Sequence, residues 1–185
     1  MARAVFLDRD GVINCKAPEG KYITQWDEVR FLPGVAKAVR CIREAGLLAV
    51  LVTNQRAVAK GLISEIQLHS LHARMWQELF GEGQGFDAVY YCPHQSEPLC
   101  GCRKPQPGML LAAARDHGID LRTSWMVGDS ESDVVIGQRV GCRTIRIGSP
   151  ELRYSTAADE VSASLLDAAD RIISQISVER SLQYN

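Results

Sequence analysis

The chain lacks an excess of charge of either sign. Among its 185 residues, 21 lysines and arginines face 22 aspartates and glutamates, which leaves a formal net charge of -1. A balance this even creates no field that would recruit nucleic acid or an anionic membrane. Aromatic residues make up only 6% of the chain, too few to favour a stacking platform for a nucleic-acid strand. We therefore expect neither nucleic acid nor membrane as a partner.

Long apolar runs are also missing. The first run, Ala4 to Leu7, ends at Asp8, whereas a signal peptide needs roughly 7–15 apolar residues. No run approaches the about 20 apolar residues that cross a bilayer. We find no repeat, low-complexity tract or linker either. These shortages predict a cytoplasmic protein with a single domain over residues 1–185.

What the chain has instead is an alternation of short apolar runs and segments of helical period. Val35, Ala38, Val39 and Ile42 follow a helical spacing that ends at Gly46. The pattern predicts a parallel sheet with helices on both faces, and a loose tail after Val178. The predicted strands are 4–7, 47–52, 88–91, 125–127 and 144–147, and further helices are expected at 64–79, 107–117 and 165–176.

Polar side chains collect just after four of these apolar runs. In open parallel sheets, ligands bind beyond the carboxyl ends of the strands. The polar groups found there are Asp8-Arg9-Asp10-Gly11, Thr53-Asn54-Gln55, Cys92-Pro93-His94, and Gly128-Asp129 with Asp133 beyond. The sequence therefore predicts a site at this edge of the sheet.

The acidic residues of this set predict a site for a hard cation. An isolated Asp-x-Asp is usually a turn or a helix cap, but Asp8 and Asp10 occur together with Asp129. Converging carboxylates repel one another unless a cation intervenes, and oxygen ligands with a phosphate favour Mg²⁺.

A carboxylate beside Mg²⁺ can attack phosphorus and form an aspartyl-phosphate. Thr53 and Lys104 are suited to holding the phosphate oxygens. Asp10 could protonate the leaving oxygen and later deprotonate water. Asp133, one helical turn past Asp129, is expected to support the site rather than bind the metal.

The cysteines suggest a second metal. Three of the six lie close together, and Cys92-x-His94 with Cys100-x-Cys102 offers three sulfurs and one imidazole. This set would close a tetrahedral Zn²⁺ with no open position, so it predicts a structural site; a reduced loop with unbound thiols is the alternative. We interpret His69 and His72, three apart on a helix, as a solvated or capped face rather than a metal pair.

Four motifs in order resemble the haloacid dehalogenase (HAD) superfamily of phosphatases. They are Leu7-Asp8-Arg9-Asp10-Gly11-Val12-Ile13-Asn14, Val52-Thr53-Asn54-Gln55, Lys104, and Gly128-Asp129-Ser130-Glu131-Ser132-Asp133. The stretch from Tyr91 to Met109 is similar to the branch of heptose-bisphosphate and histidinol-phosphate phosphatases.

This resemblance implies a Rossmann-like parallel sheet flanked by helices, without a large cap domain. It implies Asp8 as nucleophile, Asp10 as acid and base, and Thr53 and Lys104 as groups that steady the phosphoryl. It also implies Mg²⁺ on Asp8, the Asp10 backbone and Asp129, and Zn²⁺ on Cys92, His94, Cys100 and Cys102. The implied substrate-binding residues are Arg9, Glu19, Gly20, Lys21, Tyr22, Asn54, Gln55, Arg56, Arg103 and Ser130.

Within the branch, Val58-Ala59-Lys60-Gly61 is similar to the heptose enzymes, which implies removal of the 7-phosphate of D-glycero-D-manno-heptose 1,7-bisphosphate. We separately expect the protein to be a monomer. Arg56-Ala57 and Ser130 depart from that pattern. The alternatives are a histidinol-phosphate or other small sugar-phosphate phosphatase, a nucleic-acid-end phosphatase, and a catalytically dead zinc-bearing interaction module.

Overall fold

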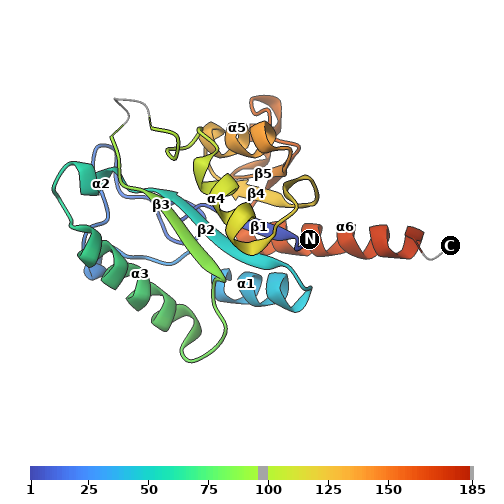
Figure 1. Cartoon of the computed structure of the whole chain (residues 1–185), viewed down its shortest axis with the longest axis horizontal. Helices are drawn as coiled ribbons and strands as arrows, with labels where there is room; N and C mark the ends of the chain where they lie inside the picture. Colours follow the sequence, from blue (N-terminus) through green and yellow to red (C-terminus); the bar gives the residue numbers. More distant parts are fainter. Residues whose placement is uncertain (96–99, 184–185) are drawn as a thin grey trace.

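The computed structural model describes residues 1–95 and 100–183. Its strands form one six-stranded parallel sheet in the order β3-β2-β1-β4-β5-β6 (Figure 1). The strands are β1 (Ala4–Leu7), β2 (Leu48–Asn54), β3 (Ala88–Cys92), β4 (Trp125–Gly128), β5 (Arg143–Ile147) and β6 (Glu160–Ser162). The predicted α/β class with a parallel sheet is confirmed.

Helices cover both faces of this sheet (Figure 1). One layer holds α1 (Val35–Glu44), α3 (Glu65–Phe80) and α6 (Leu165–Gln183), and the other holds α4 (Gly108–His117) and α5 (Glu131–Val140). Short helices occur at α2 (Arg56–Ala59) and, as 3-10 turns, at Trp26–Glu28, Leu121–Thr123 and Pro150–Tyr154. Among the described residues no segment forms a separate cap domain.

The covering of both faces explains why the central strands β1 and β4, and most of β2, are continuously apolar. In β1, Val5 and Leu7 belong to the core beneath α1, α3 and α6, whereas Ala4 and Phe6 belong to the core beneath α4 and α5. Successive side chains of a strand point to opposite faces. A strand buried on both faces therefore cannot alternate apolar with polar residues.

Two short elements and one helix end differ from the sequence-based expectation. Neither β6 nor α2 was expected, because neither shows a continuous apolar run or a helical period. The predicted loose tail after Val178 is wrong, since α6 continues to Gln183 and residues 184–185 lie outside the described part. Glu179 holds this last stretch through ion pairs to Arg3 at 3.0 Å and Arg143 at 2.6 Å.

The strand order places a crevice at the carboxyl ends of β1 and β4. From β1 the chain builds outward through β2 to β3, and it then returns to β4 on the other side of β1. Ligands of such sheets bind at the point where the order reverses. In the described part of the chain, no helix combines the length and apolarity that crossing a membrane would require. The division into one domain stays a prediction.

Candidate active site

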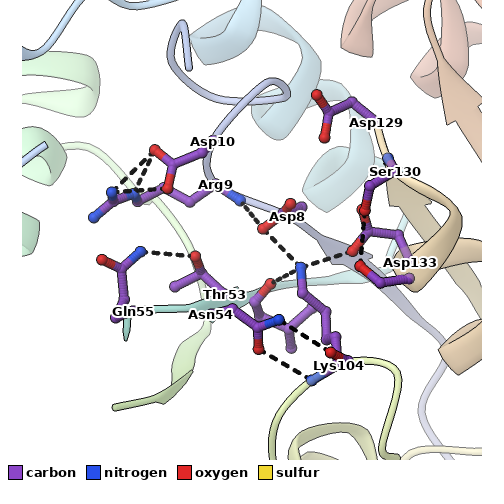
Figure 2. Close-up of polar contacts among 12 residues, drawn as sticks. Asp8, Arg9, Asp10, Thr53, Asn54, Gln55, Lys104, Asp129, Ser130 and Asp133 are labelled. Carbon is purple, nitrogen blue, oxygen red and sulfur yellow. Dashed lines mark hydrogen bonds and ion pairs between the residues drawn. The ribbon is translucent and has the colours of Figure 1, made fainter. Parts of the chain in front are cut away.

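Three carboxylates meet at this crevice (Figure 2). Asp8 follows β1, Asp129 follows β4, and Asp133 lies in the first turn of α5. Each offers an oxygen, and these oxygens all lie within 4.8 Å of one another. Segments more than a hundred residues apart thus supply one acidic cluster.

Lys104 lies among these carboxylates. Its Nζ is 2.7 Å from Asp8 Oδ1 and 2.7 Å from Asp133 Oδ1, and it donates to the Val52 carbonyl oxygen at 3.0 Å. Burial alone would lower the pKa of Lys104, but the charges of Asp8 and Asp133 outweigh burial and raise it. The side chain therefore remains a cation at neutral pH, ready to hold an anion at Asp8.

The pKa of Asp8 is unusually high for an aspartate. Burial raises the pKa of Asp8 to about 7, with Asp133 and Asp10 adding to the rise and Lys104 opposing it. Only the charged carboxylate is a nucleophile, and a nearby cation would favour that form. A cation bound beside Asp8 would therefore lower its pKa and favour the nucleophilic form.

Asp129 fits the role of a metal ligand. Its Oδ1 is buried and has no hydrogen-bond partner among the described residues, while Oδ2 lies 2.5 Å from Lys16 Nζ. Gly11, at φ +93°, passes so close that a Cβ there would lie 2.0 Å from Asp129 Oδ2. An orphaned carboxylate oxygen in an oxygen-only donor set suits a hard cation such as Mg²⁺.

Asp10 is held apart from this cluster. Figure 2 shows its carboxylate turned to Arg9, whose Nη2 lies 2.9 Å from both Oδ1 and Oδ2. Asn14 Nδ2 donates to Asp10 Oδ1 at 2.9 Å. A carboxyl group displaced from the nucleophile, yet beside it in the chain, is suited to proton transfer.

The end of β2 supplies the next group of side chains. Asn54 and Lys104 exchange two hydrogen bonds, Nδ2 to the Lys104 oxygen at 3.2 Å and the Lys104 N–H to Oδ1 at 3.0 Å. The buried Thr53 hydroxyl lies 2.9 Å from the Gln55 amide. The two bonds between Asn54 and Lys104 fix the Lys104 loop against β2.

A pocket of about 190 Å³ opens beside Asp10 and contains five of the predicted substrate-binding residues together with Lys16, which was not predicted. It is lined by Arg9, Asp10, Lys16, Ala17, Lys21, Tyr22, Ile23, Asn54 and Gln55.

The other five predicted substrate-binding residues, all in the described part of the chain, are not among the lining residues of this pocket. Glu19 and Gly20 are exposed, and Arg56 opens α2. Arg103 Nη1 donates to the His94 carbonyl oxygen at 3.3 Å, and Ser130 Oγ donates to Asp133 Oδ2 at 2.6 Å. Their substrate roles stay predictions.

The cysteine cluster forms a compact set of four donors. Cys92 Sγ lies 3.5 Å from Cys100 Sγ and 3.6 Å from His94 Nδ1. Cys102 Sγ lies 3.3 Å from His94 Nδ1 and 3.5 Å from Cys100 Sγ. Such spacings exceed a disulfide's about 2.05 Å and approach the about 3.8 Å edge of a zinc–thiolate tetrahedron. The four donors fit Zn²⁺; residues 96–99 of the predicted zinc loop at 92–102 lie outside the described residues.

The interpretation of His72 as a solvated residue is wrong. Its side chain is buried, and Nε2 lies 3.2 Å from Arg9 Nη1. His69 is exposed and contacts the Tyr91 hydroxyl at 2.7 Å. A signal for the burial existed, because His72 lies on the same helical stripe as Leu68 and Met75.

Comparison with known proteins gives consistent matches. A HAD-hydrolase-like family model matches residues 101–168. A D-glycero-beta-D-manno-heptose-1,7-bisphosphate 7-phosphatase of Pasteurella multocida is 41% identical, over 75% of this chain and 77% of its own. A D-glycero-D-manno-heptose-1,7-bisphosphate 7-phosphatase of Thermosynechococcus vestitus is 37% identical, over 94% of this chain and 96% of its own.

A solved structure agrees with this likeness. The D,D-heptose 1,7-bisphosphate phosphatase from B. bronchiseptica, complexed with magnesium and phosphate, superposes with a TM-score of 0.84. It is 31% identical, and the match covers 94% of this chain and 99% of that one.

Proposed function

We propose, from the premise that this chain belongs to the heptose-bisphosphate phosphatase family of HAD-like hydrolases, that it removes the 7-phosphate of D-glycero-D-manno-heptose 1,7-bisphosphate. The observation that carries the proposal is the meeting of Asp8, Lys104 and Asp129 at one crevice, with Asp10 held beside it.

The reaction has two displacements at phosphorus. An Asp8 oxygen attacks the phosphorus and the ester P–O bond breaks, while Asp10 gives its proton to the leaving sugar oxygen. Asp10, now a carboxylate, then takes a proton from water, whose oxygen attacks the aspartyl-phosphate. Inorganic phosphate leaves, and Asp8 is regenerated. Lys104 holds the phosphoryl oxygens through both steps, and Thr53 joins it when its hydroxyl turns from the Gln55 amide to the phosphoryl group.

Two metals complete the proposal. Mg²⁺ would be held by Asp8, the Asp10 backbone carbonyl and Asp129, and would supply positive charge to the nucleophile and the phosphoryl group. Asp133 supports this site, because its Oδ1 pairs with Lys104 Nζ at 2.7 Å and its Oδ2 accepts from Ser130 Oγ at 2.6 Å. Zn²⁺ would be held by Cys92, His94, Cys100 and Cys102, and would fix the loop that leads into Arg103 and Lys104.

The charge of the pocket favours a substrate with a second anionic group. Beyond Asp10 its lining contains Lys16 and Lys21, and Lys60 Nζ lies 5.2 Å from the ring centre of Tyr22. A bisphosphate matches such a cationic rim, whereas the cationic amine of histidinol phosphate does not. This argument places histidinol phosphate second. A monomer in the cytoplasm stays part of the proposal.

The direct test is phosphate release from heptose 1,7-bisphosphate, histidinol phosphate and simple sugar phosphates in the presence of Mg²⁺, with Asp8→Asn as the inactive control. We expect the bisphosphate to give the highest kcat/KM, with phosphorus NMR showing loss of the 7-phosphate. Preference for histidinol phosphate, or turnover by Asp8→Asn equal to wild type, would contradict the proposal.

Lys21 offers a sharper test of the second phosphate. Replacing it, as Lys21→Gln, removes one cation from the rim while leaving the acidic cluster untouched. We expect KM for the bisphosphate to rise about tenfold, which is the scale of about 1.4 kcal/mol for one lost charge-assisted contact, with kcat nearly unchanged. KM for a sugar monophosphate should change less than about twofold, and an equal rise for both would place Lys21 elsewhere.

A further inference from the structure

Arg9 is a buried cation at the centre of the site. Its side chain is only 1% exposed, and a buried charge is tolerated only when it is paired and hydrogen-bonded. The backbone around it is fixed as well, because the Arg9 carbonyl oxygen accepts from the N–H groups of Val12, Ile13 and Asn14 at 2.8 to 3.3 Å. The guanidinium is therefore built into the fold rather than free to follow a substrate.

The edge of the guanidinium that carries Nε and Nη2 binds the carboxylate of Asp10. Nε lies 3.1 Å from Asp10 Oδ1, and Nη2 lies 2.9 Å from both oxygens (Figure 2). This fork leaves Asp10 little freedom to rotate toward Asp129. At the same time the Arg9 N–H donates to Asp8 Oδ1 at 2.7 Å. One residue thus sets the position of both carboxylates relative to each other.

His72 contacts the guanidinium at Nη1, a nitrogen that does not bind Asp10. A guanidinium only donates hydrogen bonds, so the His72 Nε2 that lies 3.2 Å from Nη1 must be an acceptor. The ring is then neutral, with its proton on Nδ1. Burial and the charge of Arg9 lower the pKa of His72 to about 3, which agrees with a neutral ring. The groups facing His72 include Asp10, which opposes that shift, and His69, which adds to it.

Gln55 closes the remaining side. One end of its amide lies 3.2 Å from both Nη1 and Nη2 of Arg9 and 2.9 Å from Thr53 Oγ1. That end must be the oxygen, because two donors would otherwise face each other. Arg9 is consequently held by His72 from α3 and by Gln55 from the end of β2.

We propose that Arg9 is a positioning residue, which, held in place by His72 and Gln55, fixes the Asp10 carboxylate where it can protonate the leaving oxygen and keeps it out of the acidic cluster of Asp8, Asp129 and Asp133. This inference rests on the proposed phosphatase function. It assigns His72 on α3 a part in the reaction although no described contact joins it to Asp8.

The test compares two leaving groups in Arg9→Lys, which keeps the charge and loses the fork. A sugar alkoxide needs a proton to depart, whereas the phenolate of p-nitrophenyl phosphate does not. The constant kcat/KM covers only the steps up to departure of the first product. We expect a loss of about 10²-fold for the sugar phosphate, the lower end of what a general acid contributes, and less than about fivefold for p-nitrophenyl phosphate. Equal losses for both, or no loss for the sugar phosphate, would overturn the inference.

A pair of His72 variants tests the hydrogen bond from Arg9 to His72 without altering the arginine. His72→Gln keeps an acceptor for Nη1 and should remain within about threefold of wild type on both substrates. His72→Leu removes the acceptor and should show the same selective loss as Arg9→Lys, at smaller size. If His72→Leu slows both substrates equally, or neither, the assignment fails.

Arg43→Lys is the matched control. Arg43 on α1 pairs with Asp87, which precedes β3, at the opposite edge of the sheet, so its loss should lower stability and leave both kcat/KM values unchanged. The ratio can be measured with whichever alkyl phosphate the wild type accepts. Failure of heptose bisphosphate as a substrate would therefore contradict the proposed function and not the role of Arg9.

Discussion

Asp8 is a carboxylate whose charged form the folded chain disfavours. Its pKa is raised from 3.8 to about 7, chiefly by burial. Between those two pH values the folded state binds more protons than the unfolded state, so the stability due to Asp8 falls as pH rises. This contribution is fully present only near or below pH 3.8 and is lost by about pH 7.

A stability prediction follows for Asp8→Asn, which resembles the neutral acid at every pH. In the presence of EDTA at pH 8, we expect the variant to melt at least about 2 °C higher than wild type, the shift expected for about 1 kcal/mol in a chain of this size. The difference should shrink toward pH 5, as wild-type Asp8 takes up its proton. Scanning calorimetry checks this, and a variant less stable than wild type at pH 8 would contradict it.

Adding Mg²⁺ should make the wild type the more stable of the two proteins. An ion that binds only the folded state stabilises it in proportion to the logarithm of its concentration. Because the proposed Mg²⁺ site includes the charged Asp8, wild type should gain more from millimolar Mg²⁺ than Asp8→Asn does. The same calorimetric series measures both effects.

Single residues also mark what a sequence alone can and cannot predict about the site. Asp8 and Asp129 could be placed together, because each follows an apolar run and the carboxyl ends of parallel strands meet at one end of the sheet. Lys104 follows no apolar run, and only its match to a motif of the family placed it with them. The contact between Arg9 and His72 could not, since it joins the turn after β1 to α3, and the two residues are far apart in the sequence. Lys16 was missed because a lysine in a loop carries no period or motif.

At the scale of elements, the segment between β3 and α4 contains residues of both proposed sites: Cys100 and Cys102 of the zinc site, and Lys104 of the active site. Gly108, the first residue of α4, leaves so little room that a Cβ there would lie 2.3 Å from the Gly101 carbonyl oxygen. Lys104 is also tied independently to β2 through Asn54. Loss of zinc should thus disturb Arg103, which contacts His94, more than it disturbs Lys104.

Cys100→Ser tests this division. We expect the zinc-free variant to keep its Mg²⁺ dependence, to show a KM raised about tenfold and to retain kcat within about threefold, because only contacts at the Arg103 side are loosened. Zinc content is measured by atomic absorption and turnover in parallel. Full wild-type KM in a demonstrably zinc-free variant would contradict a supporting role for zinc, and Cys15→Ser, an exposed cysteine outside the cluster, is the control.

Elements with a continuous apolar run or a helical period were predictable, and elements with neither were not. The runs that became β1, β2 and β4 are apolar because both faces of the sheet are covered. In β6 the three residues Glu160 to Ser162 contain one apolar side chain, which no rule of periodicity can distinguish from a loop. The length of α6 depended on ion pairs to residues far away in the sequence.

At the scale of the whole molecule, the helix α6 lies away from the candidate active site. The site lies at the carboxyl ends of the strands, whereas α6 packs with α1 against one face of the sheet (Figure 1). Ile172 of α6 is fully buried there, and Leu182 near its end is exposed. Substitutions in α6 should therefore change the free energy of unfolding without changing turnover.

Ile172→Ala should lower the free energy of unfolding by about 2–5 kcal/mol, the usual cost of a cavity in a core. At temperatures where the variant is folded, kcat should stay within about twofold of wild type. Urea unfolding and phosphate release measure the two quantities. Leu182→Ala is the control and should change neither, and a large drop in kcat for Ile172→Ala would mean that α6 communicates with the crevice.

The ion pair between Lys16 and Asp129 Oδ2 puts a cation of the chain's own beside the proposed metal site. The ammonium at 2.5 Å offsets the charge of Asp129, which lowers the repulsion among the clustered carboxylates when no divalent ion is bound. Loading with Mg²⁺ then becomes an exchange of one cation for another. The Mg²⁺ concentration needed for half-maximal activity would then report how much more tightly the site binds Mg²⁺ than the Lys16 ammonium. Lys16, once displaced, would be free to contact the sugar.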